Sequence, residues 1–404
     1  MRKSGQQKAF RQIPETIWVL GFVSMLMDIS SEMIHSLLPV FLVSVLGVSA
    51  LTVGLIEGVA EAVALISKVF SGALSDYLGR RKALVVIGYT LATATKPLFA
   101  LASGAGLVFT ARFVDRVGKG IRGAPRDALI ADLTPEESRG AAFGLRQSLD
   151  TVGALLGPLL AIGLMLLWAD DFRAVFWLAL VPGVLALLLL VVGVREPQRE
   201  PAEKPVNPVH WRELKRLDRA YWWVVAIGAA FSLARFSEAF LILRAQQGGM
   251  VPAWIPAVLV TMNLVYALTA YPAGSLSDRV GPARLLVPGL VVLIAADLVL
   301  AQASSWAAVL VGVALWGLHL GLTQGLLAKL VADTAPVDLR GTAFGFFNLL
   351  SGLALLLSSV LAGLLWDSFG ASYTFYAGTL FCLLALLAIV TGSAWRTPDD
   401  QAQS

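Results

Sequence analysis

The chain has 404 residues, of which 57% are hydrophobic and 14% are charged, and its mean hydropathy is +0.76. So little charge cannot cover a soluble globule of this length, which excludes the soluble classes of enzyme and binding domain. The composition therefore indicates an integral membrane protein whose surroundings are a lipid bilayer.

A helix needs about 20 residues to cross the hydrocarbon of a bilayer. We expect twelve such helices, at residues 16–46, 51–74, 83–101, 106–130, 141–168, 173–194, 220–243, 253–275, 284–303, 306–331, 341–365 and 373–393. Almost no residues remain for an extramembrane domain, so the predicted fold class is an all-α membrane protein with twelve transmembrane helices.

The basic residues are distributed unevenly between the two ends of these helices. With the N-terminus inside, the segments on the cytoplasmic side hold 19 of the 31 Lys and Arg, whereas the other side holds only Arg173 and Arg244. This asymmetry predicts a plasma (inner) membrane protein with both termini in the cytoplasm. Because it accounts for the net charge of +4, no nucleic-acid partner is expected.

Residues 195–219 contain four prolines and many charged side chains, so they cannot continue the sixth helix. We expect a cytoplasmic linker here, between an N-terminal six-helix bundle at 1–194 and a C-terminal six-helix bundle at 220–404. Cys382 is the only cysteine and the three histidines are scattered, so we expect no intrachain disulfide, no metal site and no cofactor.

Two loops of the first half repeat in the second. GALSDYLGRRK at Gly72–Lys82 returns as GSLSDRVGPAR at Gly274–Arg284, 202 residues later, and RGAAFG at Arg139–Gly144 returns as RGTAFG at Arg340–Gly345, 201 residues later. Parallel repeats of this kind imply two halves related by an axis along the membrane normal, with the substrate site at their shared interface.

The first loop resembles a signature of the major facilitator superfamily, G-x-L-x-D-x-x-G-R-R-K. The matching residues are Gly72, Leu74, Asp76, Gly79, Arg80, Arg81 and Lys82. The second copy departs from the signature, because Pro282 and Ala283 replace two basic residues. The resemblance covers essentially the whole chain and implies two pseudo-symmetric six-helix bundles.

A second signature, G-x8-G-x3-G-P-x2-G-G, is typical of the drug/proton antiporters of that superfamily. The fifth predicted helix matches it at Gly144, Gly153, Gly157 and Pro158, whereas Ala161 and Ile162 replace the final glycines. The sequence thus resembles the twelve-helix drug/proton antiporter branch, with two glycines missing.

The resemblance also implies gating residues at the cytoplasmic ends of the helices. In this family the loop aspartate engages the start of a helix in the opposite half when the inside is shut, a role that falls to Asp76 and Asp278. The other residues given gating roles are Arg80, Arg139, Arg340, Arg146, Asp150, Gly153, Gly157 and Pro158. The two glycines are expected to contact the eighth helix. The arginine and aspartate of the fifth helix either line the cytoplasmic vestibule or only form an i, i+4 salt bridge.

Asp28, Glu32 and His35 lie at i, i+4 and i+7 of the first predicted helix, on one face near the middle of the membrane. Two carboxylates this close repel each other, and burial disfavours their charged form, so one of them can load and release a proton near neutral pH. His35 titrates in that range by itself. With Glu61 of the second helix, these are the candidates for proton coupling. The alternative is a permanently paired cluster that only holds helices together.

The fourth predicted helix carries a basic stripe. Arg112, Arg116, Lys119, Arg122 and Arg126 fall within an arc of about 120° on a helix of 3.6 residues per turn. A charge exposed to hydrocarbon costs roughly 2.5 to 3.5 kcal/mol, so the stripe must face water, acids or an anionic ligand. The first three residues are candidates for binding an anionic substrate. The alternative is a fixed network, because the N-terminal spans hold seven acids against eight bases.

The C-terminal half carries far less charge. Its candidates for substrate binding are Glu238, Tyr266, Trp316 and Asn348, although a single residue of this kind is more often packed than bound to a ligand. We therefore expect coupling in the N-terminal half and mainly apolar contacts from the other half.

Together these features predict a proton-coupled secondary transporter that acts as a monomer on a small-molecule substrate. Export of a small anionic or zwitterionic organic solute is the leading hypothesis, and uptake or exchange of an anionic metabolite is the alternative. The chain is not expected to be an enzyme, because it contains no HExxH, Walker loop or GxSxG motif.

Overall fold

The computed structural model describes residues 13–196 and 213–391, except Gly79, Gly281 and 337–338. All regular elements within these ranges are helices. Two compact units divide the chain, one made of residues 1–48, 63–208 and 251–260 and the other of 49–62, 209–250 and 261–404. The predicted linker at 195–219 lies largely outside the described residues, so the predicted bundle boundaries stay predictions.

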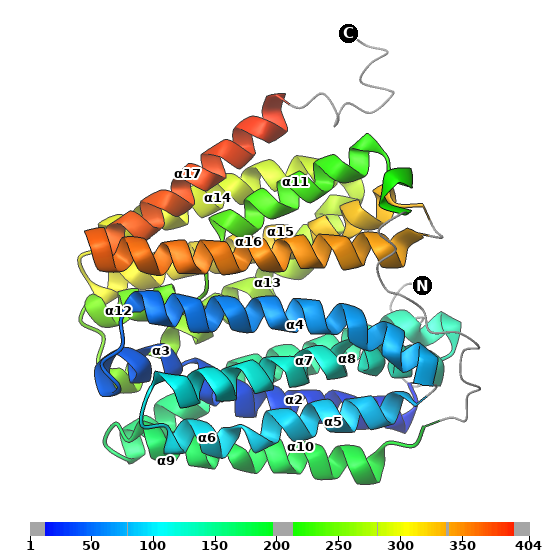
Figure 1. Ribbon diagram of the computed structural model, residues 1–404, viewed down its shortest axis with the longest axis horizontal. Coiled ribbons are helices and arrows are strands. Elements are labelled where there is room, and N and C mark those ends of the chain that lie inside the picture. Colours follow the sequence, from blue (N-terminus) through cyan, green and yellow to red (C-terminus); the bar gives the residue numbers. More distant parts are fainter. Residues whose placement is uncertain (1–12, 79, 197–212, 281, 337–338, 392–404) are drawn as a thin grey trace. The chain divides into compact units, whose positions relative to one another are not determined.

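The first unit contains most of the helices before the linker (Figure 1). They are α2 (Glu15–His35), α3 (Leu38–Val40), the π-helix η1 (Phe41–Val45), the second part of α4 (Ala50–Leu78), α5 (Arg81–Ala94), α6 (Lys96–Leu101), α7 (Ala105–Leu133), η2 (Glu136–Ser138), α8 (Arg139–Leu167), α9 (Phe172–Leu178) and α10 (Leu180–Gly193), with η4 (Pro252–Trp254). A buried apolar core that includes Leu20, Tyr89, Leu129 and Leu190 joins α2, α5, α7 and α10.

The second unit contains the first part of α4 and the helices after the linker (Figure 1). They are η3 (Glu213–Arg216), α11 (Arg219–Ala234), α12 (Ala239–Gln247), most of α13 (Ala257–Val280), α14 (Pro282–Gln302), α15 (Trp306–Thr334), α16 (Arg340–Phe369) and α17 (Ala371–Thr391). Its centre is aromatic, since Phe236 lies 5.2 Å from Trp316 and 5.5 Å from Phe375 between ring centroids.

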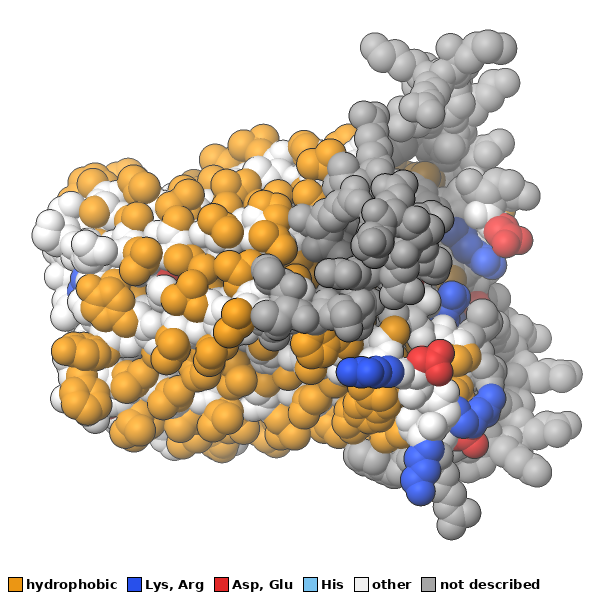
Figure 2. All heavy atoms as spheres, turned by 90° about the horizontal axis from the view of Figure 1, so that it is seen from above, with side chains coloured by type: hydrophobic (Ala, Val, Ile, Leu, Met, Phe, Trp, Pro, Cys, Tyr) orange, Lys and Arg blue, Asp and Glu red, His pale blue; other side chains and the backbone are white. Residues whose placement is uncertain are grey.

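Ten helices or helix pairs in the described ranges are long and apolar enough to cross a membrane. The basic stripe lowers the hydropathy of α7, which is the eleventh span by length, and α17 with its shorter apolar stretch is the twelfth. The twelve predicted spans are therefore confirmed. Figure 2 shows hydrophobic side chains over most of one face, with Lys, Arg, Asp and Glu gathered at one end.

Three predicted spans, the first, third and sixth, are interrupted shortly before a proline. The helix before each break ends three or four residues ahead of Pro39, Pro97 and Pro182. At these three sites the proline has no N–H to donate and its ring crowds the carbonyl four residues earlier, which accounts for the interruption. At the break in the sixth span, the Oγ of Ser30 donates a hydrogen bond to the carbonyl of Ala179 at 2.6 Å.

The seventh predicted span is also divided, although no proline explains it. α11 ends at Ala234 and α12 begins at Ala239, and Arg235 between them has an extended backbone with φ −110° and ψ 90°. The Oγ of Ser359 accepts a hydrogen bond from the backbone N–H of Ser237 at 3.2 Å. A side chain of α16 thus satisfies a donor that the interrupted helix leaves open.

The glycines of the antiporter signature bring α8 against α2. A Cβ added at Gly153 would lie 2.6 Å from the carbonyl oxygen of Met25, and one at Gly157 would lie 2.7 Å from the Cβ of Glu32. These glycines therefore pack closely on the first span, and their expected contact with the eighth stays a prediction. Periodicity showed that they share a face but not which helix covers it.

The glycines of α7 serve close packing. A Cβ at Gly118 would lie 2.6 Å from the carbonyl of Gly88 in α5, and one at Gly120 would lie 2.8 Å from the carbonyl of Ala64 in α4. Pro125 lies inside α7, which continues to Leu133. α7 thus packs closely between α4 and α5, and these contacts position its charged stripe.

Two alanine substitutions in α8 test this packing. Gly153→Ala should lower the free energy of unfolding by about 1–3 kcal/mol, because the added methyl group overpacks the contact with α2. Gly144→Ala is the matched control, because a Cβ there meets nothing within 4 Å. It should be neutral or stabilise the protein by up to about 1 kcal/mol, since alanine favours helix over glycine. Thermal unfolding of the purified protein in detergent measures both, and equal effects would contradict the packing of α8 on α2.

Candidate functional site

Asp115 of α7 lies at the centre of a buried ion cluster. The Nζ of Lys96 donates to its Oδ1 at 3.1 Å, while Arg116 and Arg112 form ion pairs with its Oδ2 at 3.8 and 4.0 Å. All four side chains are at most 5% exposed. Two of the three predicted substrate-binding cations, Arg112 and Arg116, are therefore paired within the protein, as the network hypothesis proposed for them.

The break in the third span places Lys96 in this cluster. Lys96 is the first residue of α6, directly after the interruption that Pro97 imposes. Its Nζ also donates to the Oγ of Ser31 at 3.1 Å, which links the cluster to α2. The sequence contained the signal, a lysine beside a proline in the middle of a span, but not the partner.

Lys119 differs from the other cations of the stripe because its side chain is exposed. It interacts electrostatically with both Asp28 and Glu32 of α2. Glu32 is 22% exposed and lies 3.5 Å from the Nδ1 of His35. The structure therefore brings together one accessible cation and the predicted proton-coupling carboxylates on one side of the first unit.

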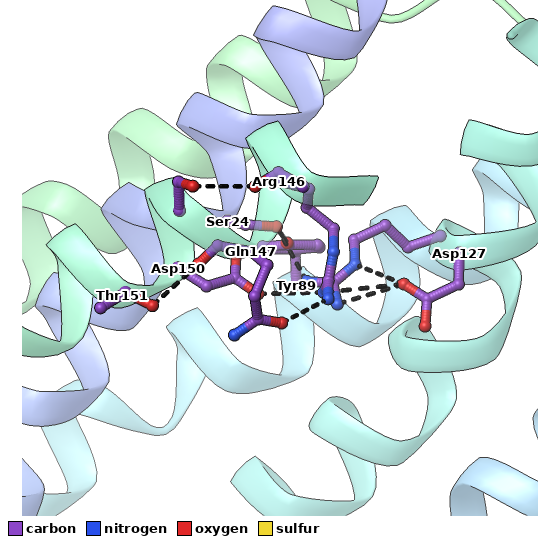
Figure 3. A network of polar contacts seen from close by, with 10 residues as sticks. Ser24, Tyr89, Asp127, Arg146, Gln147, Asp150 and Thr151 are labelled. Carbon is purple, nitrogen blue, oxygen red and sulfur yellow. Dashed lines mark hydrogen bonds and ion pairs between the residues drawn. The ribbon is translucent and has the colours of Figure 1, made fainter. Parts of the chain in front are cut away.

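A second ion cluster surrounds Arg146 of α8 (Figure 3). Its Nη1 lies 2.9 Å from the Oδ2 of Asp150 and 3.7 Å from the Oδ1 of Asp127. The i, i+4 salt bridge predicted between Arg146 and Asp150 is present, while their place in a cytoplasmic vestibule stays a prediction. Asp28 interacts electrostatically with Asp150, so the two clusters meet at α2.

Arg126 connects this second cluster to the core of the first unit. Its Nη2 lies 3.3 Å from the Oδ1 of Asp127, and its Nη1 donates to the Oγ of Ser24 at 2.8 Å. The hydroxyl groups of Ser24 and Tyr89 are 3.2 Å apart, and the guanidinium of Arg122 lies 4.7 Å from the centroid of the Tyr89 ring. The C-terminal half of the stripe is thus anchored on α2 and α5, and these contacts hold α7 in place.

The loop after α4 is organised by Arg81, which sequence reasoning did not select. Its guanidinium lies 3.2 Å from Asp76 and 2.9 Å from Asp132 at the end of α7. Arg80, the predicted gating residue, is exposed. The backbone N–H groups of Arg81 and Lys82 donate to the Oε1 of Glu196. Within the first unit, Asp76 at the end of α4 thus has an arginine partner at the start of α5, and its contact with the opposite half stays a prediction.

The other predicted gating residues are placed with less detail. The Nε of Arg139 donates to the carbonyl of Ala131 at 3.3 Å, and Arg340 is exposed at the start of α16. Asp278 belongs to α13, but its side chain lies outside the described residues. Pro158 is buried inside α8. Their gating roles remain untested.

Glu61 belongs to the part of α4 that is assigned to the second unit. Its role in proton coupling therefore stays a prediction.

The break between α11 and α12 in the second unit contains a cation, Arg235. Arg235 interacts electrostatically with Glu238 and Tyr266, so two predicted substrate-binding residues lie near one cation.

Two further candidates of the second unit have different surroundings. Trp316 is 1% exposed and packs on Phe236, which makes it part of the core. Asn348 is half-buried in α16. His319 is buried and its Nδ1 lies 2.8 Å from the carbonyl of Gly289. In the described part of the chain, no three His, Cys, Asp or Glu residues are grouped closely enough to hold a metal ion.

The chain is similar in sequence to known proteins along almost its whole length. The family model of the Major Facilitator Superfamily matches residues 20–257 and 245–404. An uncharacterized MFS-type transporter of Methanocaldococcus jannaschii is 33% identical over 389 residues, which cover 94% of this chain and 95% of that protein. Multidrug resistance protein 1 of Bacillus subtilis is 22% identical over 341 residues, which cover 83% and 84% of the two chains.

Solved structures with little sequence identity share the fold. A POT family transporter in complex with 5-aminolevulinic acid has a TM-score of 0.79 at 14% identity, covering 93% of this chain and 96% of its own. The human organic anion transporter MFSD10 has a TM-score of 0.66 at 17% identity, covering 94% and 99%.

The Asp115 cluster predicts a difference between two charge-removing substitutions in α7. Asp115→Asn should lower the free energy of unfolding by about 3–5 kcal/mol, because it removes a negative charge that three buried cations share. Lys119→Gln should change it by no more than about 0.5 kcal/mol, because this side chain is exposed. Thermal unfolding in detergent compares them. If Asp115→Asn unfolded as the parent protein does, Asp115 would not be the counter-charge on which these cations depend.

Proposed function

The chain belongs to the major facilitator superfamily, and from that premise we propose that it is a proton-coupled secondary active transporter exporting a small anionic or zwitterionic organic solute by alternating access. The family accounts for the all-helical fold and its twelve spans, and its solved members share this fold. It also consists of transporters that bind small molecules in a membrane and not of enzymes. Proton coupling, the solute class and the direction are our proposal.

One observation carries the proposal: an exposed cation of α7 lies beside two partly exposed carboxylates of α2. Lys119 interacts with Asp28 and Glu32, while the neighbouring arginines are held by Asp115. Intramembrane charges that face an accessible space are typical of substrate and proton pathways. The three side chains form a site of both signs, which fits a solute that carries an acid group and an amino group.

Antiport follows if the amino group of a zwitterion binds at Glu32. A proton and an ammonium group cannot both occupy one carboxylate, so protonation would release the solute while Lys119 holds its acid group. Raising the pH then strengthens solute binding. The glycines of α8 resemble the antiporter signature, and a multidrug resistance protein is among the relatives, which supports export.

The position of Lys119 between two acids also favours a second candidate, uptake of a simple anion. Protonation of Asp28 or Glu32 would remove the negative charge that holds Lys119 and free it for the anion, so the proton and the solute would bind together. Lowering the pH would then strengthen binding. The sign of the pH dependence therefore separates antiport from symport.

The proposal extends to the location of the protein and to its gate. We place the protein in the plasma membrane as a monomer with both termini in the cytoplasm. Asp76, Arg81 and Asp132 would control the cytoplasmic side, because breaking their ion pairs frees the loop between α4 and α5.

Glu32→Gln tests the coupling site. In proteoliposomes with an imposed pH gradient, this variant should show no solute-dependent proton movement above that of empty liposomes, because an amide cannot take up a proton. The solutes are 5-aminolevulinic acid, benzoate and tetraphenylphosphonium, as zwitterionic, anionic and cationic probes. Glu15→Gln is the control, since Glu15 is an exposed carboxylate in the first turn of the same helix. Unchanged proton movement and uphill flux in Glu32→Gln would refute the choice of coupling residue.

Lys119→Gln tests solute charge. The apparent affinity for the transported anion or zwitterion should fall roughly tenfold or more, because a hydrogen bond to a charged group contributes about 1.5–3 kcal/mol. Lys119→Arg should retain most of the affinity. Initial transport rates against solute concentration give both values. If both variants bind as the parent protein does, or if only the cationic probe is transported, the solute class is wrong.

A further inference from the structure

A cavity of about 330 Å³ lies between α13 and α15 within the second unit. The two helices touch at Gly317, where a Cβ would lie 2.5 Å from the carbonyl of Met262, and again at Gly321, where it would overlap the side chain of Thr269. Farther along, a Cβ at Gly274 or Gly325 meets nothing within 4 Å. The helices therefore separate toward the C-terminal ends of α13 and α15, and glycines keep the space between them open.

The matching place in the first unit is filled. The loop repeat, with its offset of 202 residues, pairs Lys68 of α4 with Ala270 of α13. The Cδ of Lys68 lies 3.6 Å from a Cβ built on Gly123 of α7, so the lysine side chain covers this region. Ala270 lines the cavity instead. The opening is thus a specific feature of the second unit and not a general consequence of the fold.

Polar groups line this space at several levels. Tyr266 is at one end of the lining on α13, and Gln324 and Lys329 contribute from α15. Tyr266 also interacts with Arg235, the cation at the break between α11 and α12. Lys329 lies within a span, five residues before α15 ends, where a charge requires an accessible polar space or a partner. One cation, Lys329, thus lines the cavity, and a second, Arg235, interacts with a lining residue, Tyr266.

We propose that this cavity binds the acid group of an organic anion, with Lys329 as counter-charge and Tyr266 and Gln324 as hydrogen-bonding groups. The inference rests on the proposed function, because the anion is the transported solute and the cavity supplies part of its recognition. The volume is within the range of about 300–1,000 Å³ typical of small-molecule sites. Specificity for the acid group then resides in the second unit as well as at Lys119.

Charge-selective labelling of a cysteine in the cavity tests this proposal. Cys382, the only native cysteine, is fully buried, so the parent protein provides an unreactive background. Gly325→Cys places a thiol where a Cβ has room, and Gly106→Cys in α7 is an exposed control with equal room. Each variant reacts in detergent with an anionic sulfonatoethyl or a cationic trimethylammonioethyl methanethiosulfonate. If Gly325→Cys fails to fold, Gly274→Cys on the opposite wall takes its place.

The measured quantity is the ratio of anionic to cationic reaction rates. A unit positive charge about 6 Å away raises the local concentration of an anion, and lowers that of a cation, roughly threefold each in water, so the ratio rises roughly tenfold. It should exceed the ratio at Gly106→Cys by about this factor and should fall by a similar factor when Lys329→Gln is added. Absence of reaction at both cavity positions, or a ratio insensitive to Lys329→Gln, overturns the proposal.

Two arms separate the alternatives. In nanodiscs of phosphatidylcholine the anionic reagent should react as in detergent. If phosphatidylglycerol nanodiscs slow it specifically, a lipid headgroup occupies the cavity and the solute assignment is overturned. Labelling needs no gradient and no proton movement, so its failure leaves the role of Glu32 intact. Conversely, loss of coupled flux with normal labelling would refute the proposed function and not the anion site.

Discussion

A charge in the hydrocarbon of a membrane requires a partner, and in the first unit Asp115 supplies one. Its carboxylate faces Lys96, Arg112 and Arg116 in a space closed to solvent. Each cation alone would be costly in α7, but an acid among three bases lowers that cost and fixes the rotation of the helix. This rotation leaves Lys119 on the accessible side. The buried cluster therefore positions α7, and the exposed lysine lies beside Asp28 and Glu32 of α2.

Close helix packing gives the carboxylates their positions. Gly153 and Gly157 let α8 approach the backbone of α2 at the turns that carry Asp28 and Glu32. A larger residue at either position would push α2 away, and the two acids would move with it. The glycines of the antiporter signature thus position the carboxylates that we propose for proton coupling, within one unit. Their effect on transport needs no direct contact with solute.

The sequence predicted the twelve spans, the helix face shared by the acids of α2 and the balance of charges in the first half. Those features follow from composition and periodicity, which are local properties. It did not predict the partners. Arg81 and not Arg80 binds Asp76 and Asp132, because the turn into α5 decides which of two adjacent arginines points inward. The break at Arg235 was not predicted either, because no proline lies next to it in the sequence.

The two units solve the same packing problem with different chemistry. α7 and α15 begin and end 201 residues apart, so Asp115 and Trp316 occupy equivalent positions, as do Gly120 and Gly321. Gly120 makes a close contact with α4, and Gly321 makes the equivalent contact with α13. The central position, however, holds an ion cluster in one unit and an aromatic core in the other. The repeat thus retains the contacts that determine helix packing and not the groups that recognise solute. In the proposed mechanism, the first unit contributes carboxylates beside an exposed cation, whereas the second contributes the polar cavity between α13 and α15.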